Sequence, residues 1–415
     1  MSSFPRDPAF DSTFALLREG YRFIPARCER LDTDVFETRL MLRRAICMRG
    51  EEAARMFYAP DRFTRRGALP QTTLRLLQDK GSVATLDGAA HRRRKAMFMS
   101  LMGAESLAAL EAAAEDAWQA RIATWPARQD VVLLDEAHAV FCRAACRWAG
   151  IPLPEAETPA RTRELAAMIA GAGAFGPSVL KALRLRRRTE RWASGLVRQV
   201  RRGALQAPEG SALRVFAEHR DAEGQLLPPG TVAVELINIL RPTVAVARFV
   251  VFAALALHRE PAWRRRLAAA PTSAELEAFV QEVRRFHPFF PMVAGRVRAA
   301  FDWRGHHFRD GDWVLLDLYG TDHDPRIWGD PEVFRPERFH DWDGSPFNFV
   351  PQGGGEHFTG HRCPGEWATI ALMRGAVRLL ARLPWDMPEQ DLTVDLSRMP
   401  AQPRSGVILR LAPPG

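Results

Sequence analysis

Lysine, tyrosine and cysteine are scarce in this sequence of 415 residues, which has three lysines, three tyrosines and five cysteines. The 58 basic residues therefore include 55 arginines, and this skew explains the formal charge of +9 better as a coding bias than as a nucleic-acid surface. An odd and small number of cysteines argues against a disulfide framework, so reduced thiols are expected. Cys142 and Cys146 lie four apart, but no further ligand follows at metal-site spacing, and we expect them to be buried core residues.

Several other signals are missing. The apolar stretches are short or interrupted, and residues 1–10 (MSSFPRDPAF) lack the cationic and apolar regions of a secretory leader. No repeat and no Gly/Ser-rich linker divides the chain. The arginine-rich run at 183–191 has no interleaved aromatic residues and is typical of a solvated helix face. We therefore expect a single domain over 1–415, a cytoplasmic location, no membrane span and no nucleic-acid partner.

The composition, 47% apolar and 26% charged, is that of a globular protein. Residues 36–48 alternate in polarity as strands do, whereas 51–285 show mostly helical periodicity. Further strand candidates occur at 293–301 and 313–317, and one late helix is expected after Cys363. These patterns predict a mainly α fold with a small β-rich region.

The segment 347–366, FNFVPQGGGEHFTGHRCPGE, concentrates unusual residues. Its three consecutive glycines allow the backbone to approach a flat or bulky group, and Pro364 suits the first position of a helix. Cys363 would then lie at a helix N-terminus, where the dipole and free N–H groups favour the thiolate that can ligate iron. A glycine-rich loop that merely contains a buried cysteine is the alternative.

A second motif, FVQEVRRFHP, places Glu282 and Arg285 three residues apart on one helix face, where they can pair. Arg338, in FRPERF, is a candidate third member of this cluster. An ordinary exposed ion pair is the alternative. In their order and spacing, the E-x-x-R helix, the P-E-R-F element and Cys363 followed by x-Gly resemble the cytochrome P450 superfamily. This resemblance implies the P450 fold, with haem b between a long central helix and the cysteine-bearing loop.

The helical segment 232–257 is apolar on almost every face and is expected to be buried, yet it contains Arg241 and Pro242. An unpaired guanidinium costs several kcal/mol, roughly, in such a place. Glu235, six residues away, is not within one turn to pair with it. Pro242 removes a helix hydrogen bond and opens space at that point. The pair predicts an anion receptor suited to a carboxylate, with an arginine that reaches the surface as the alternative.

The stretch Leu240 to Thr243 lacks the acid–alcohol pair of ordinary P450 monooxygenases, and Glu356 stands where those enzymes have a phenylalanine before the cysteine. Over residues 21–406 the sequence is similar to the fatty-acid peroxygenase branch, family 152. The resemblance implies that Cys363 is the axial iron ligand and that Arg241 holds the fatty-acid carboxylate, which acts as the general acid–base for hydrogen peroxide. It also implies that Pro242 shapes the space for peroxide.

The same resemblance implies that His91, Lys95 and Arg65 bind the haem propionates; His91 and Lys95 are four apart and share a helix face. Otherwise they are plain surface cations. Phe289 and Phe290 would line the acyl pocket, with core packing as the alternative.

Two positions depart from the family. Ala84 replaces the glutamine or histidine above the haem that is implicated in steering hydroxylation against decarboxylation, and Gln78 replaces an apolar pocket residue.

The expected activity is hydrogen-peroxide-dependent hydroxylation of long-chain fatty acids at the α or β carbon, with decarboxylation to terminal alkenes as a side reaction and no redox partner. A redox-partner-dependent monooxygenase and a non-catalytic haem or fatty-acid binding protein are the alternatives. Regiochemistry and chain-length preference do not follow from the sequence.

Overall fold

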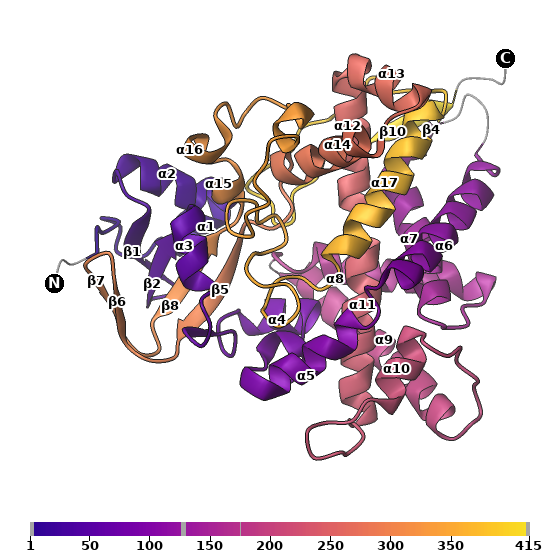
Figure 1. Ribbon diagram of the computed structural model, residues 1–415, viewed down its shortest axis with the longest axis horizontal. Coiled ribbons are helices and arrows are strands. Elements are labelled where there is room, and N and C mark those ends of the chain that lie inside the picture. Colours follow the sequence, from indigo (N-terminus) through magenta and orange to yellow (C-terminus); the bar gives the residue numbers. More distant parts are fainter. Residues whose placement is uncertain (1–3, 126–129, 175, 412–415) are drawn as a thin grey trace.

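The computed structural model describes residues 4–125, 130–174 and 176–411. Helices make up most of these residues and the strands form small sheets, so the predicted mainly α fold with a small β-rich region is confirmed. Figure 1 shows the main sheet at one end of the molecule, beside the N-terminus, and the helices at the other end. The segment that leads into the late helix α17 passes between these two parts (Figure 1).

The helical elements follow the chain in this order. The α-helices are α1 Thr13–Glu19, α2 Phe23–Arg30, α3 Glu51–Phe57, α4 Gln71–Leu77, α5 Gly88–Met99, α6 Ala104–Ile122, α7 Leu133–Trp148, α8 Thr158–Ala170, α9 Pro177–Arg201, α10 Ala212–Glu218, α11 Pro229–Ala245, α12 Ala247–Arg259, α13 Pro261–Ala269, α14 Ser273–Phe286, α15 Tyr319–Asp322, α16 Pro325–Trp328 and α17 Glu366–Arg382. Short 3-10 turns are η1 Gly20–Arg22, η2 Val83–Thr85, η3 Glu155–Glu157 and η4 Pro336–Phe339.

The strands are β1 Val35–Leu40, β2 Arg43–Met48, β3 Phe63–Thr64, β4 Asp130–Val132, β5 Met292–Val297, β6 Phe301–Trp303, β7 His306–Phe308, β8 Trp313–Asp317, β9 Trp385–Asp386 and β10 Ile408–Leu411. They form a five-stranded sheet in the order β1-β2-β8-β5-β3, a three-stranded sheet β4-β10-β9 and the hairpin β6-β7. The predicted strand at 293–301 is wrong in its extent, because β5 ends at Val297 and a new strand begins at Phe301.

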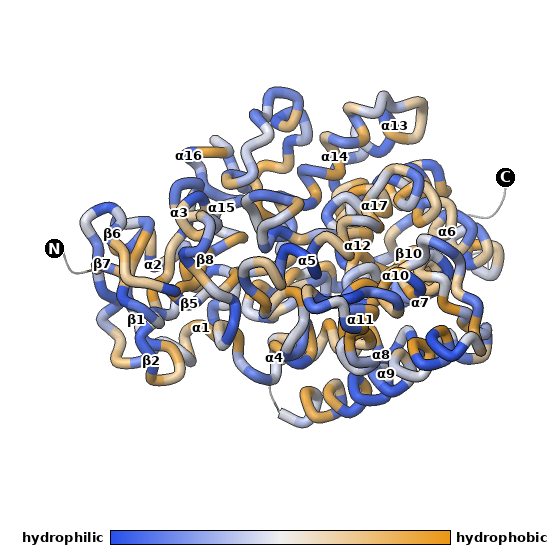
Figure 2. The backbone as a smooth tube through the Cα atoms, turned by 60° about the horizontal axis from the view of Figure 1, so that its bottom comes forward, coloured by the Kyte–Doolittle hydropathy of each residue, from blue (hydrophilic) through white to orange (hydrophobic). Residues whose placement is uncertain are grey.

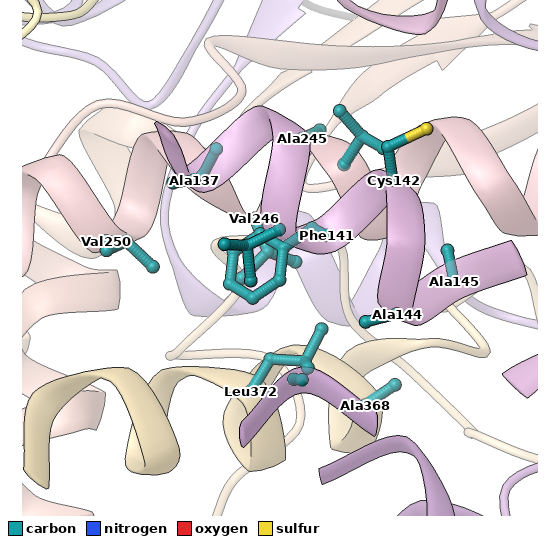
Figure 3. Close-up of a cluster of buried hydrophobic side chains, with 14 of the residues drawn as sticks. Ala137, Phe141, Cys142, Ala144, Ala145, Ala245, Val246, Val250, Ala368 and Leu372 are labelled. Atoms are coloured by element: carbon teal, nitrogen blue, oxygen red, sulfur yellow. The ribbon is translucent and has the colours of Figure 1, made fainter. Parts of the chain in front are cut away.

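The helical core forms where α7, α11, α12 and α17 meet. Figure 3 shows Phe141 of α7 close to Val246 and Val250, above Leu372 of α17. Cys142 lies in this apolar cluster, and all five cysteines are free thiols, as expected. No group of histidine, cysteine and acidic residues that could hold a metal ion occurs in the described ranges.

The predicted buried helix at 232–257 is present as α11 and α12, which are interrupted at Val246. The expectation that no apolar stretch is long enough to span a membrane is wrong for Pro229–Arg259, and the bent pair α5 and α6 also passes if it is counted as one span. However, 94% of the most apolar window of Pro229–Arg259 is buried inside the protein. A buried core helix meets the same criterion, so this finding is weak evidence for a span.

The arginine-rich run at 183–191 lies on α9, as predicted. Arg184, Arg187 and Arg188 are exposed, which fits a solvated helix face. Arg186 differs because its side chain is only 2% exposed and donates from Nε to Glu190 Oε1 at 2.6 Å.

Candidate functional site

The predicted cluster of Glu282, Arg285 and Arg338 is formed and buried. Arg285 donates to both carboxylate oxygens of Glu282, at 2.7 and 2.8 Å, and both side chains are fully buried. Arg338 approaches the same carboxylate from η4, with Nε 3.3 Å from Oε1, and the backbone N–H of Arg335 donates to it at 2.8 Å. The cluster therefore ties α14 to the chain that leads to Cys363, and the alternative of an exposed pair is wrong.

Cys363 does not lie at the first turn of α17. The helix begins at Glu366 with Gly365 as its N-cap, so Pro364 occupies the turn before the helix and the predicted N1 position is wrong. The reason is that the chain turns through Pro364 and Gly365 before helical hydrogen bonds begin. The Gly365 N–H is nevertheless directed at the Cys363 sulfur and lowers its pKa.

Burial is the largest influence on the Cys363 thiol and raises its pKa, and Glu366 raises it further. Lys95, the Gly365 N–H and Arg284 act in the opposite direction. The backbone N–H thus favours the thiolate as predicted, but in the protein without a metal burial outweighs it, because desolvation opposes the charged form. Binding of a cation at the sulfur would supply the missing stabilisation of the thiolate.

A further buried network, which the sequence motifs did not reveal, supports the cysteine loop. Arg284 of α14 donates to Glu366 Oε1 at 2.6 Å, and Arg362 donates to Glu366 Oε2 at 2.6 Å. Burial by itself would raise the pKa of Glu366, but Arg284 and Arg362 lower it to about 2. The residues on either side of Cys363 are thus held by one carboxylate.

Gln352 is a second supporting residue that the sequence alone did not identify. Its side-chain amide donates to Thr369 Oγ1 at 3.1 Å and lies 3.8 Å from Cys363 Sγ. An N–H directed at the sulfur favours the thiolate form. The only available signal was its place within the segment 347–366.

The glycine run of the cysteine loop packs against Tyr58. A Cβ atom at Gly355 would lie 2.8 Å from Tyr58 Cβ, and one at Gly354 would lie 2.4 Å from the Pro346 carbonyl oxygen. Gly353 and Gly355 also have positive φ angles of 91° and 83°. The predicted close approach is therefore present, but the partners that require glycine here are protein atoms.

The three predicted propionate-binding residues lie in one region, beside the cysteine loop. Lys95 is 1% exposed and donates from Nζ to the Arg362 carbonyl oxygen, one residue before Cys363. The His91 ring lies 4.0 Å from the His361 ring, centroid to centroid. Arg65 donates to the Ala294 carbonyl oxygen at 2.7 Å.

These groups influence one another electrostatically, which shows their proximity. Burial, together with Lys95 and Arg65, lowers the pKa of His91 to about 4. Burial also lowers the pKa of Lys95 to about 8 and that of His361 to about 2. Within the described residues neither Lys95 nor Arg65 forms an ion pair with a carboxylate, so an unpaired positive region is present beside Cys363. His361, two residues before the cysteine, belongs to this region although no motif identified it.

Arg241 is buried in the middle of α11. Among the residues that the structure describes, its one hydrogen-bond acceptor is the carbonyl oxygen of Leu77 at the end of α4, which Nη2 contacts, and its Nε has none. Burial and the nearby Arg186 lower the pKa of Arg241 to about 9, whereas Cys363 raises it. Arg241 and Cys363 are therefore close enough to interact electrostatically.

Glu235 does not pair with Arg241 because it has partners of its own. It accepts from Arg94 Nη1 and from the Val83 N–H, both at 2.8 Å, and it is fully buried. The bond to Val83 fastens η2, which contains Ala84, to α11. Arg94 and Glu235 thus help to position η2 against α11. No sequence motif indicates that they pair, since they are 141 positions apart.

The remaining predicted residues have separate surroundings. Pro242 lies inside α11, four residues before the interruption at Val246. The Phe289 ring is buried and stacks on Phe249 of α12 at 4.0 Å, and Phe290 is 37% exposed with its ring 5.0 Å from that of Phe289. The stacking favours the alternative of core packing for Phe289. The roles assigned to these positions stay predictions.

The residues present fit haem. A free thiol at Cys363 can ligate iron, and the unpaired Lys95 and Arg65 offer charge to two propionate carboxylates. On the facing side, the Nε of Arg241 is a buried donor without an acceptor. A buried orphan cation indicates that an anion completes the site.

A cytochrome P450 family model matches residues 275–407. A solved structure of cytochrome P450SP alpha (CYP152B1) in complex with (R)-ibuprofen is 45% identical, with a TM-score of 0.94 over 96% of this chain and 98% of that chain. Cytochrome P450EX alpha (CYP152N1) with myristic acid is 42% identical, with a TM-score of 0.95 over 99% of both chains. A variant of cytochrome P450 OleT with arachidonic acid is 35% identical, with a TM-score of 0.95 over 99% of this chain and 98% of that chain.

Curated sequence relatives are more distant. Cytochrome P450 71A8 of Mentha piperita is 31% identical over 143 residues, which are 33% of this chain and 28% of that protein. Melianol synthase CYP71BQ4 of Citrus sinensis is 31% identical over 126 residues, 29% of this chain and 24% of that protein. The chain thus spans about a quarter of the length of these plant proteins.

A cysteine loop held by a buried E-x-x-R cluster, in a helical fold of this topology, defines a cytochrome P450, and this class of protein holds haem through a cysteine thiolate. The likeness to the three CYP152 structures extends over at least 96% of the chain. The chain belongs to the CYP152 family of the cytochrome P450 superfamily, the peroxygenase branch that its sequence resembles, and it is an oxidoreductase.

Proposed function

We propose that this enzyme uses hydrogen peroxide to hydroxylate long-chain fatty acids at the α or β carbon, with decarboxylation to a terminal alkene as a side reaction. The fatty acids seen with P450EX alpha and OleT support this substrate class. No redox partner is required in this proposal. The cytoplasmic location stays a prediction.

The observation that carries the proposal is the incomplete hydrogen bonding of Arg241. Its side chain is buried, its Nε has no acceptor, and no described carboxylate forms an ion pair with it. A guanidinium presents paired N–H groups that match the two oxygens of a carboxylate. A fatty-acid carboxylate would satisfy both the charge and the open donor, so the site selects an anion rather than a neutral hydrocarbon.

The bound carboxylate supplies a group that α11 lacks. Glu235, the nearest acid of α11 in sequence, is held by Arg94 and Val83. The hydroxyl of Thr243 donates to the Ile239 carbonyl oxygen of its own helix at 2.8 Å. Neither side chain is free to relay a proton. A carboxylate oxygen on Arg241 would accept the peroxide proton and return it to the distal oxygen as general acid–base.

Haem b would be held by the Cys363 thiolate, with its propionates at His91, Lys95 and Arg65. When bound, it supplies the oxidising iron centre, and thiolate ligation promotes cleavage of the O–O bond. Pro242, next to Arg241, leaves the space in which peroxide is positioned, since proline has no N–H and cannot continue the helix ladder. The side chain of Ala84 contributes no donor or acceptor, so it does not steer the reaction between hydroxylation and decarboxylation by a hydrogen bond.

The test is product analysis with the haem-loaded enzyme, a saturated long-chain fatty acid and hydrogen peroxide, without a reductant or redox partner. We expect hydroxy acid, with or without terminal alkene. Arg241→Leu should lower the rate by at least roughly 100-fold, because about 3 kcal/mol of charge-assisted binding is lost. Arg241→Lys should retain part of the activity.

Arg187→Leu, at an exposed position of α9, is the matched control and should turn over like the parent. Recovery of only intact fatty acid with intact haem would overturn the proposal. Turnover that appears only with NAD(P)H and a reductase would assign the enzyme to the monooxygenases instead.

A further inference from the structure

A group of large apolar side chains is exposed near the N-terminus. Phe10 is 75% exposed, Phe14 77%, Leu42 73% and Met41 49%. We call these four residues the N-terminal apolar patch. Single exposed apolar residues are normal on protein surfaces, but a contiguous group of this kind marks an interaction site.

Hydrogen bonds hold the four residues side by side. The Met41 N–H donates to Thr13 Oγ1, and the Leu42 N–H donates to Asp11 Oδ2 at 2.7 Å. The β1–β2 turn is thereby fastened to the start of α1, between Phe10 and Phe14.

The turn itself departs from ordinary turn chemistry. Leu40 pairs with Arg43, so Met41 and Leu42 form a two-residue turn, and their φ angles are 53° and 58°. Such turns require the left-handed region at both positions and favour Asn-Gly, whereas bulky residues are strained there. Two large apolar residues therefore stand exposed at a conformational cost. Such violations of local rules are expected where a residue serves function.

Unpaired positive charge surrounds the patch. Glu19 and Glu37, the nearby acids, are already paired with Arg27 and Arg44. Asp11 accepts from the backbone N–H groups of Thr13 and Leu42, and its carboxylate is further stabilised by Arg39. Three arginines of α1, β1 and β2 have no ion-pair partner in the part of the chain that the structure describes: Arg18, Arg39 and Arg43. The guanidinium of Arg39 lies over the Phe10 ring, 5.4 Å from its centroid. Apolar side chains with a rim of arginine match an anionic lipid surface, with acyl chains below and phosphate groups above.

The segment that carries Phe14 and the helices near Arg241 contact a common loop. Gly20, after α1, and Gly173, after α8, both lie against the loop 396–399. A Cβ atom at Gly20 would be 2.0 Å from the Leu396 carbonyl oxygen, and one at Gly173 would be 2.1 Å from that of Met399. Figure 2 shows β2, α1, α4 and α9 along one edge. Leu180 of α9 is also 70% exposed.

We propose that the N-terminal apolar patch docks the enzyme on an anionic lipid surface. Phe14 and Leu42 insert between headgroups, and the arginine rim contacts lipid phosphates. Docking of this kind is peripheral and involves no membrane-spanning helix. Because long-chain fatty acids partition into lipid, the patch would bring the side of the molecule that carries α4 and α9 to the phase that holds such compounds.

The test is sedimentation of the full-length, haem-loaded enzyme with vesicles of phosphatidylcholine, with and without phosphatidylglycerol, in the absence of peroxide. We expect binding that requires phosphatidylglycerol and weakens with salt. The double variant Phe14→Ser with Leu42→Ser should lower the partition coefficient by roughly tenfold or more. Arg18→Gln and Arg43→Gln should each lower it by about fivefold.

Val333→Ser is the control, because Val333 is 51% exposed and follows α16, which lies on the opposite edge from α1 in Figure 2. It should bind vesicles like the parent. Haem absorbance and the melting temperature of each variant establish that it is folded.

Equal binding to both vesicle types, or unchanged binding of the double variant, would overturn the proposal. So would a dimer in solution that the double variant abolishes, since a second copy would then cover the patch. Turnover is not part of the readout, so failure here is distinct from failure of the proposed peroxygenase activity.

Discussion

Buried arginines are paired with acids on one side of the haem-binding region but not on the other. Behind Cys363, Glu282 holds Arg285 and Arg338, and Glu366 holds Arg284 and Arg362. On α11, Arg241 has one backbone acceptor and no acid. In the first arrangement every arginine has a carboxylate partner within the protein, and the arrangement positions the cysteine loop, whereas in the second Arg241 gains a carboxylate partner only when an anion binds.

Arg248 of α12 sharpens the contrast, because it is seven residues from Arg241 and also has no acid partner. It donates to three backbone carbonyl oxygens, those of Ala401, Pro288 and Phe289, at 2.9 to 3.3 Å, and its guanidinium lies 4.7 Å from the Phe289 ring. A buried arginine without an acid is therefore not by itself a binding site. Arg241 is distinguished by the combination of an unsatisfied Nε and the lack of an acid partner among the described residues.

The largest loss of stability is expected when the acid-paired cluster behind Cys363 is broken. Glu282→Gln leaves Arg285 buried without a counter-charge and should lower the free energy of unfolding by about 3–5 kcal/mol. Urea unfolding measures the loss. The control is Glu218→Gln, which removes an exposed pair with Arg214 and should cost less than about 0.5 kcal/mol. A loss below about 1 kcal/mol for Glu282→Gln would show that the cluster does not hold this part of the fold.

Replacing the two buried arginines should change the free energy of unfolding in opposite directions. Arg248→Leu leaves the carbonyl oxygens of Ala401 and Pro288 without their donor, whereas that of Phe289 still accepts from the Tyr21 hydroxyl, and the change should destabilise the protein by about 1–3 kcal/mol. Arg241→Leu removes an incompletely paired charge from an apolar helix and should stabilise the fatty-acid-free protein by about 1 kcal/mol.

Thermal unfolding with and without a long-chain fatty acid measures the stability of each variant and its stabilisation by the ligand. The ligand should raise the melting temperature of the parent and of Arg248→Leu, but not that of Arg241→Leu. Destabilisation of equal size in both variants would remove the distinction between the two arginines.

The smallest effect concerns pH. Burial, together with Arg259, His323 and Arg285, lowers the pKa of His287 well below 6.5. The unfolded chain therefore takes up a proton below pH 6.5 that the folded chain refuses, and stability falls as the pH falls through this range. The contribution of one group is at most about 1.4 kcal/mol per pH unit.

His287→Phe keeps the stacking on Phe252, whose ring lies 4.5 Å away, and removes the titrating group. Urea unfolding at pH 7, 6 and 5 should show a shallower decline for this variant than for the parent. If the free energy of unfolding fell equally in the variant and the parent, His287 would not contribute to the loss of stability between pH 7 and pH 5.

Motifs along the chain were sufficient for the fold class and for the principal residues of the site. Cys363, the Glu282–Arg285 pair and Arg241 stand out because each is unusual among its sequence neighbours. The P450 resemblance that they support is confirmed by the structural likeness over nearly the whole chain. Boundaries were less accurate, since β5 ends early and α17 begins three residues after Cys363.

The amino-acid sequence contains the local features: helix periodicity, a cysteine before a turn, and a guanidinium without an acid within one turn. The pairing of the charges follows from how the chain folds. Glu235 is engaged by Arg94, 141 positions away, and the single acceptor of Arg241 is the Leu77 carbonyl oxygen, 164 positions away. The physical reason is that burial and hydrogen bonding depend on every element that packs around a group, and those elements come from distant parts of the chain.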